Sequence, residues 1–260
     1  MAQGDTILDN DAGPLVRLGW TLVSIAALAA IWHLAATALQ SRVLPGPIEV
    51  TSTLLNELKA GALAWHLGAT LARVAASFLL AVVIGTAIGL ALGRLRWIDR
   101  FFDSWLILFL NLPVLVVVIL CYVWFGLTEV AAITAVAINK IPNFAVTMRE
   151  GTRSLSKDLA EMAEVYRFGR WRTLRHVILP QLAPFFMAAV RSGLALVWKI
   201  VLVVELLGRS NGVGYQLNVA FQLFDVSLIL AYAIAFILVV QVIEVGILQP
   251  LEVRAGRWRR

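Results

Sequence analysis

Residues 104–126 read SWLILFLNLPVLVVVILCYVWFG, and no charged side chain interrupts this run. Apolar segments of roughly 18 residues or more are long enough to cross a bilayer as a helix. Within lipid, every backbone polar group must be satisfied inside the segment, which favours a helix. The alternation over about ten residues that marks a transmembrane β-strand is missing from this run. The stretch therefore predicts a membrane-spanning helix.

Similar apolar runs recur on both sides of this stretch. The chain has 260 residues, of which 60% are hydrophobic, and its mean hydropathy is +0.85. Soluble domains contain only about 45–50% apolar residues. We therefore predict an all-α, polytopic membrane bundle of six transmembrane helices. The spans are expected near residues 18–39, 68–92, 104–126, 130–148, 182–207 and 226–249.

The first predicted span must be distinguished from a signal peptide, because residues 36–38 (ATA) resemble a cleavage site. Signal peptides begin with a positively charged region. The segment before this span instead contains three aspartates, Asp5, Asp9 and Asp11. Arg17 is its only basic residue. We therefore expect the first span to be retained as a helix.

Lysine and arginine are distributed unequally over the loops between the predicted spans. With the N-terminus placed inside, the outer segments contain only Arg42, Lys59 and Arg209. The positive-inside rule then places both termini and residues 149–180 in the cytoplasm. We expect a cytoplasmic N-terminal tail, a single transmembrane domain that includes a coupling segment, and a basic cytoplasmic C-terminal tail. Their bounds are 1–17, 18–250 (with the segment at about 158–180) and 251–260.

Several catalytic signatures are absent from the sequence. It contains no G-x-x-x-x-G-K-[ST] phosphate loop, no G-x-S-x-G elbow and no H-E-x-x-H pair. His33, His66 and His176 lack ligand-like spacing, and the lone Cys121 excludes an internal disulfide. We therefore expect no enzyme activity, no metal site and no cofactor in this chain. The net charge of +6 fits cytoplasmic loops better than a nucleic-acid partner.

Residues 161–184, EMAEVYRFGRWRTLRHVILPQLAP, concentrate charge between long apolar runs. We predict one helix over 158–178, with acids near its start and arginines later, an order that complements the helix dipole. Pro180 should end this helix and begin the fifth span, where its missing N–H costs least. Composition alone leaves two interpretations open. The helix either lies on the membrane with its arginines against anionic lipid, or docks a soluble cytoplasmic partner.

Charged side chains inside predicted spans are costly and often functional. Lys199 lies mid-span, and with Lys140 it is a candidate for attracting an anion along a central aqueous path. The alternative is structural pairing between helices or snorkelling to an interface, which we assign to Arg191 and Glu205. The candidate path residues are Asn139, Lys140, Trp198 and Lys199.

Three smaller features concern packing and the outer surface. The second span repeats glycine every four residues from Gly85 to Gly93, which allows close helix packing. Residues 48–59 read as a short amphipathic helix near the outer surface. The glycine-rich stretch 208–217 reads as an outer turn that reaches a gate or a delivering protein.

The central segment resembles the coupling-helix motif of bacterial ABC importer permeases. That motif runs Glu-Ala-Ala, then glycine, then an aliphatic residue, any residue and Leu-Pro. Met162 replaces the first alanine here, and Arg167 stands at the usual glycine position. The resemblance implies that the segment docks on an ATPase subunit. The residues it implicates are Glu161, Ala163, Glu164, Arg167, Gly169, Leu179 and Pro180.

The resemblance extends over about residues 40–250. LPGPIEV, HLGATLARVAASFLLAVVIGTAIGLALG, VWFG, LPQLAPFFMAAVRSGLALVW and ELLGRSNGVGYQL occur in the order typical of the nitrate/taurine/sulfonate branch. It implies a type I ABC importer permease architecture with a cytoplasmic coupling helix, in the bacterial inner membrane. The implied partners are a second permease copy in a homodimer, two cytoplasmic ATPase subunits that bind ATP and Mg, a periplasmic substrate-binding protein, and membrane lipid.

The implied function is import of a small, anionic solute, such as a sulfonate, taurine, nitrate or a carboxylate-like compound. One alternative is a secondary transporter or channel that works without ATPases. Another is a membrane scaffold that only docks a soluble partner. The coupling motif favours the importer, and we find no convincing inverted repeat of the kind many secondary transporters contain.

Overall fold

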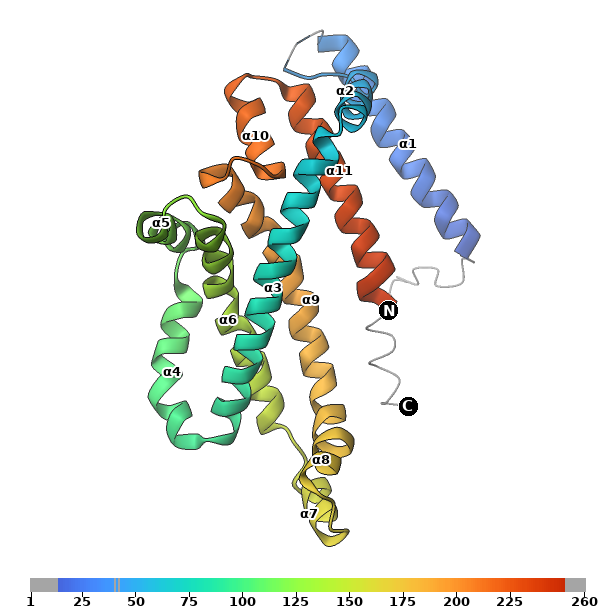
Figure 1. The fold of residues 1–260 in the computed structure, drawn as a ribbon. Helices are drawn as coiled ribbons and strands as arrows, with labels where there is room; N and C mark the ends of the chain where they lie inside the picture. The colour runs from blue at the N-terminus through green and yellow to red at the C-terminus, as the bar shows by residue number, and fades with distance from the viewer. Residues whose placement is uncertain (1–13, 40, 42, 251–260) are drawn as a thin grey trace, which may run out of the picture.

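Long helices run along a common axis in the computed structural model (Figure 1). The structure describes residues 14–39, 41 and 43–250, so most of the predicted N-terminal tail and all of the C-terminal tail lie outside the described residues. No strand occurs within those ranges, and the all-α prediction is confirmed. The helices are α1 (Pro14–Leu39), α2 (Pro47–Lys59), α3 (Ala62–Arg94), α4 (Arg96–Asn111), α5 (Val114–Phe125), α6 (Glu129–Arg153), α7 (Lys157–Val165), α8 (Arg170–Thr173), α9 (Leu179–Gly208), α10 (Val213–Gln222) and α11 (Val226–Ile243), with π-helical η1 (Leu174–Ile178) and η2 (Glu244–Leu248).

Helices long and apolar enough to cross a membrane occur at five of the predicted spans within the described residues. They are α1, α3, α6, the continuous segment Arg170–Gly208 that contains α9, and α11 with η2. α1 begins at Pro14, inside the predicted tail, and reaches the predicted end at Leu39. The hydropathy pattern therefore locates these helices correctly.

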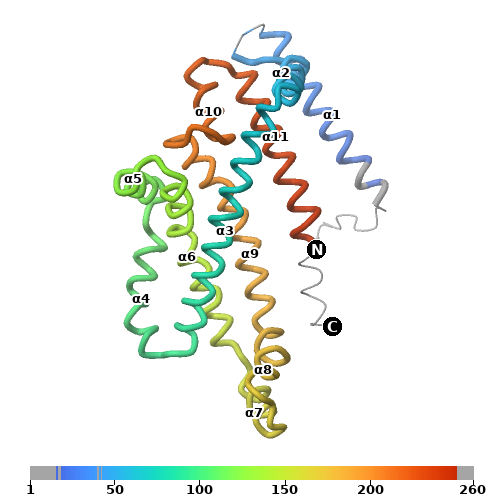
Figure 2. Tube along the Cα trace, in the orientation of Figure 1, coloured from blue at the N-terminus to red at the C-terminus, as the bar shows by residue number. Residues whose placement is uncertain are grey.

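The remaining predicted span, 104–126, is not one straight helix. α4 and α5 form it together and differ in direction by 96° (Figure 2). The bend lies at Leu112 and Pro113. Proline has no N–H to donate, and the residue before a proline prefers extended backbone. Leu112 has φ −66° and ψ 126°, so the charge-free stretch turns at its own proline.

α3 and α6 pack closely through the glycines of α3. A Cβ atom on Gly85 would lie 2.5 Å from Cβ of Phe144 on α6. A Cβ atom on Gly89 would lie 2.5 Å from the carbonyl oxygen of Ala145. Side chains cannot be accommodated at such distances, and Gly93 is equally crowded by Thr152. The packing role predicted from the glycine spacing is confirmed.

The main core lies where α3, α5, α6, α9 and α11 meet. Val118, Val197, Val201 and Tyr232 are completely shielded from solvent in it. The hydroxyl group of Tyr232 also donates a hydrogen bond to Oε2 of Glu57 at 2.8 Å, which ties the predicted amphipathic helix α2 to α11. α1 stands apart from these helices, and most of its described side chains are exposed (Figure 1).

The glycine-rich stretch 208–217 is only partly a turn. α9 ends at Gly208, but α10 already begins at Val213. The hydroxyl group of Thr70 accepts the N–H of Val213 at 2.8 Å, so a side chain of α3 satisfies a free donor at the start of α10. The predicted turn is therefore limited to 209–212, because contacts with α3 stabilise a helix that the local sequence did not indicate.

Candidate coupling and translocation sites

The charged central segment lies at one end of the molecule, where α7 and α8 extend beyond the other helices (Figure 1). Ser156 caps α7 by accepting a hydrogen bond from the N–H of Leu159 at 3.3 Å. The exposed side chains of the segment include Glu161, Glu164, Val165, Tyr166 and Trp171. Large apolar groups exposed beside acids are typical of a surface that contacts another protein or a membrane.

The prediction of a single helix over 158–178 is wrong. A helix cap ends α7 at Val165, and α8 begins only at Arg170. The N–H of Phe168 donates to the carbonyl of Ala163 at 2.8 Å. The N–H of Arg167 donates to the carbonyl of Glu164 at 2.9 Å. These two bonds form the Schellman arrangement, which ends a helix with a residue in the left-handed region. Arg167 is that residue, with φ 51°.

The left-handed backbone gives a physical reason for the glycine expected at position 167. For residues other than glycine this conformation costs about 1 kcal/mol or more. We predict that Arg167→Gly strengthens the turn by about 0.5–1 kcal/mol, after allowing for the freedom of glycine in the unfolded chain. Hydrogen exchange at the Phe168 amide should then slow roughly twofold to fivefold. Arg170→Gly, inside a normal helical turn, is the control and should not slow it.

Pro180 does not end the cytoplasmic helix, contrary to prediction. Helical structure is continuous from Arg170 to Gly208 and passes through η1 just before Pro180. At the end of η1 the N–H of Leu179 donates to the carbonyl of Leu174, one residue further back than in an α-helix. This wider turn accommodates the proline ring, which would clash with a carbonyl in regular α-helix. α8, η1 and α9 therefore form one helical arm.

Gln181 connects the entry of α7 to the base of α9. Its Oε1 accepts the N–H of Ser156 at 2.9 Å, and its Nε2 donates to the carbonyl of Val177 at 2.8 Å. Ala163 of α7 is buried, whereas Leu179 is 52% exposed. Gln181 therefore links Ser156, the residue that caps α7, to the helical segment that continues through α9.

A charged cluster lies toward the opposite end of the bundle and joins α3, α6 and α9. Arg73 of α3 donates to Glu205 of α9 at 2.6 Å and to both carboxylate oxygens of Glu129 of α6 at 2.7 and 2.8 Å. It also donates to the backbone carbonyl of Asn211 at 2.9 Å. Arg209 pairs with Glu129 at 2.5 Å. Two guanidinium groups and two carboxylates thus neutralise one another.

Glu205 is completely buried at the centre of this cluster. Its Oε2 accepts hydrogen bonds from the hydroxyl group of Thr70 and from the N–H of Gly214, both at 2.9 Å. Nδ1 of His66 accepts the N–H of Gly212 at 3.0 Å. The loop after α9 and the start of α10 are therefore held on α3.

The structural pairing predicted for Glu205 is confirmed by its contact with Arg73. Arg191 also lies near a carboxylate of another helical element, 3.8 Å from Glu244. No sequence pattern singled out Arg73 or Glu129. The signal for Arg73 was nevertheless present, because an arginine inside an apolar span requires a partner.

Lys140 is 5% exposed near the middle of α6. Its ammonium group has no hydrogen bond or ion pair with any described residue. A cation so placed in a membrane domain is a candidate contact for an anion.

The other candidate path residues lie in different surroundings. Asn139 is 8% exposed and precedes Lys140 on α6. Trp198 is buried and packs edge-on against Phe236 of α11, with the ring centres 5.9 Å apart. Lys199 is exposed on α9. The structure thus buries Asn139 and Lys140 together, places Trp198 in the core, and leaves Lys199 on the surface of the single chain.

No group of three His, Cys, Asp or Glu side chains that could hold a metal ion occurs in the part of the chain that the structure describes.

Known proteins resemble this chain in sequence and fold. Residues 81–248 match the family described as "Binding-protein-dependent transport system inner membrane component". The chain is 30% identical over 247 residues to the "Putative aliphatic sulfonates transport permease protein SsuC" of Bacillus subtilis (strain 168), covering 94% of this chain and 89% of the relative. It is 26% identical over 242 residues to the "Taurine transport system permease protein TauC" of Escherichia coli (strain K12), covering 90% and 88%.

The fold also matches a solved structure, described as "Crystal structure of an amino acid ABC transporter with histidines". The TM-score is 0.60 at 21% sequence identity, and the match covers 77% of this chain and 98% of the other. At this identity the likeness shows the fold alone. Over the matched part, this chain therefore has an ABC transporter permease fold.

Proposed function

Because the chain belongs to the binding-protein-dependent transport system inner membrane components, which are permeases of ABC importers and not enzymes, we propose that it forms the path for a small anionic solute. A periplasmic binding protein delivers the solute to the outer end of the path. ATP hydrolysis by separate cytoplasmic subunits drives its passage inward.

The proposed assembly contains two copies of this chain and two ATPase subunits. ATP and Mg are assigned to those subunits, because this chain contains no phosphate loop. The distribution of lysine and arginine supports a cytoplasmic position for both termini and for α7. The Arg73 cluster then lies toward the periplasmic side, where the binding protein docks.

Docking of the ATPase on α7 is supported by the exposure of its acidic face. Glu161 and Glu164 project from α7, while Ala163 points into the protein. Gln181 of α9 accepts a hydrogen bond from the N–H of Ser156, the residue that caps α7, and donates one to the carbonyl of Val177 in η1. Closure of the ATPases on this helix would therefore move a membrane-spanning element, which is the physical requirement for alternating access.

The burial of Lys140 without a described partner is the observation that supports an anionic solute. A buried ammonium group without a counter-ion is unfavourable in a medium of low dielectric constant. A passing sulfonate, nitrate or carboxylate group would supply the missing charge. Relatives named for aliphatic sulfonates and taurine are consistent with such a group.

The function can be tested in proteoliposomes that contain the chain, its ATPase subunits and its binding protein. Radiolabelled methanesulfonate, taurine and nitrate serve as probes. We expect at least one of them to accumulate only when ATP and the binding protein are both present. Equal accumulation without the ATPases would instead identify a secondary transporter or channel. ATP-dependent import restricted to an uncharged probe, such as dimethyl sulfone, would contradict an anionic solute.

Lys140→Gln should reduce import of the anionic probe at least tenfold at low solute concentration. The amide removes the charge at similar size, and a hydrogen bond to a charged group contributes about 1.5–3 kcal/mol. Lys140→Arg keeps the charge and should retain more activity than Lys140→Gln. Initial uptake rates over a range of solute concentrations measure both effects.

Lys199→Gln provides the matched comparison, because it removes the same charge from an exposed position. Its effect on import should be smaller than that of Lys140→Gln. Binding of the ATPase subunits should be unchanged in all three variants, which separates loss of solute contact from loss of assembly. An uptake rate for Lys140→Gln equal to that of the wild type would exclude the proposed contact.

A further inference from the structure

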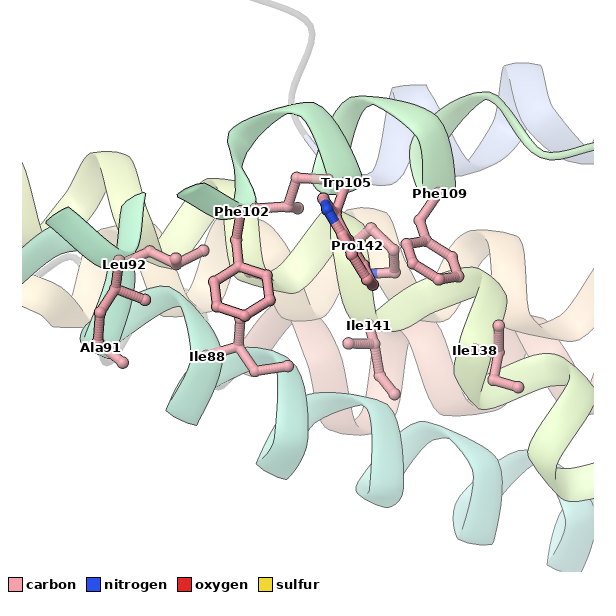
Figure 3. A pocket seen from close by; sticks show the side chains of 12 residues that line it. Ile88, Ala91, Leu92, Phe102, Trp105, Phe109, Ile138, Ile141 and Pro142 are labelled. Atoms are coloured by element: carbon pink, nitrogen blue, oxygen red, sulfur yellow. The ribbon is translucent and has the colours of Figure 1, made fainter. Parts of the chain in front are cut away.

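An apolar groove lies between α3, α4 and α6, with a volume of about 480 Å³. Phe102, Trp105 and Phe109 extend from α4 toward residues of α3 and α6 (Figure 3). Every lining side chain is apolar except for the indole N–H of Trp105. The other lining residues are Ile88, Ala91, Leu92, Ile98, Leu106, Ile138, Ile141, Pro142 and Ala145.

The groove has the depth of one membrane leaflet. Its lining along α4 extends from Ile98 to Phe109, which corresponds to about 16 Å at the helical rise of 1.5 Å per residue. The hydrocarbon core of a bilayer is about 30 Å thick, so one leaflet contributes about half of that depth. Leu92 and Ile98 place one end of the groove at the turn between α3 and α4.

Unpaired basic residues surround that end of the groove. Arg94, Arg96 and Arg100 are exposed, and none of their side chains has a hydrogen bond or an ion pair with the described part of the chain. Trp97, which lies among them, is 71% exposed. Tryptophan and arginine at a helix end are typical of the membrane interface. The turn therefore lies where lipid headgroups are found.

The acids near this turn do not neutralise the three arginines. Asp99 and Asp103 of α4 are both engaged by Arg149 of α6, at 3.2 and 2.6 Å. Arg153 pairs with Asp99 as well. The local charge at the mouth of the groove is therefore positive. The groove itself is apolar and suited to a hydrocarbon chain.

We propose that the groove and its mouth bind an anionic phospholipid. One acyl chain occupies the space between α3, α4 and α6, and the phosphate group contacts Arg94, Arg96 and Arg100. The placement in the cytoplasmic leaflet rests on the proposed orientation of the permease. Clustered basic residues beside membrane helices attract anionic headgroups in this way.

Native mass spectrometry of the purified full chain tests the proposal. Phosphatidylglycerol and phosphatidylcholine with identical acyl chains are titrated in separate experiments. We expect tighter binding of phosphatidylglycerol to the wild type. The triple variant Arg94→Gln/Arg96→Gln/Arg100→Gln should bind it roughly tenfold to hundredfold more weakly. The matched control, Arg170→Gln/Arg172→Gln/Arg175→Gln, removes three arginines from α8 and η1 and should keep the wild-type affinity.

Two further measurements address the groove itself. Ala91→Phe fills its lining and should weaken binding of both lipids, and size-exclusion chromatography checks that this variant is folded. Glycerophosphoglycerol, the headgroup without acyl chains, should not displace the lipid at equal concentration. Equal affinity for both lipids, an unaffected triple variant or displacement by the headgroup alone would overturn the proposal. So would a disulfide between two copies formed through Phe102→Cys, because a second chain would then cover the groove. None of these results depends on transport, so they are independent of the proposed function.

Discussion

Replacing Arg73 by methionine should destabilise the protein by about 3–5 kcal/mol. The substitution removes the partner of Glu205, whose side chain is completely buried, and leaves a carboxylate without its counter-ion. Loss of one member of a buried pair is more costly than loss of the whole pair. The measurements are the yield of monodisperse protein and the unfolding midpoint in detergent. Both should fall clearly below those of the wild type.

The double variant Arg73→Met/Glu205→Gln separates charge from packing. Glutamine at 205 is neutral and still offers an oxygen to the N–H of Gly214, so much of the lost stability should return. Arg191→Met is the control, since its pair with Glu244 is longer, at 3.8 Å, and the Arg191 side chain is 54% exposed. Removing such a pair should cost about 1 kcal/mol or less. If the single and double variants were equally unstable, the unpaired charge would not be the cause.

Glu161→Lys should abolish ATP-dependent import and reduce co-purification of the ATPase subunits by more than tenfold. The side chain is exposed on α7, and reversing its charge at a protein interface places like charges together, which costs several kcal/mol. The fold should be unaffected, because no described residue bonds to this carboxylate. Co-purification from detergent and uptake in proteoliposomes measure the two effects.

Glu49→Lys is the matched control for the ATPase contact. Glu49 is also an exposed acid on a short helix, but it lies on α2, away from the coupling segment. ATPase subunits should co-purify with this variant as they do with the wild type. Normal co-purification and normal import by Glu161→Lys would show that the ATPase contacts another surface.

The sequence predicted the membrane helices well because their signal is local. A helix crosses the bilayer if enough consecutive residues are apolar, and this property needs no knowledge of neighbouring helices. Gly85, Gly89 and Gly93 carried a similar local signal, since a four-residue spacing places them on one face. Their contact with α6 confirmed it. Hydropathy does not indicate the direction of a helix axis, however, so it did not predict the bend between α4 and α5 at Pro113.

The coupling segment shows the limit of a one-dimensional pattern. Its concentration of charge was apparent in the sequence, and its resemblance to a known motif directed attention to Glu161. The break after α7 depends on the left-handed backbone of Arg167, a conformation that arginine does not signal. Likewise the course of the helix through Pro180 depends on a widened turn in η1.

The sequence by itself determined that this chain is a helical membrane protein, roughly where each span lies and where positive charge gathers. Only the tertiary structure decided which intramembrane charges neutralise one another. Arg73 and Glu205 meet across two helices, whereas Lys140 is buried without a described partner. The physical reason is that insertion depends on the summed hydrophobicity of consecutive residues, while an ion pair depends on a distance of a few ångströms between residues far apart in the chain.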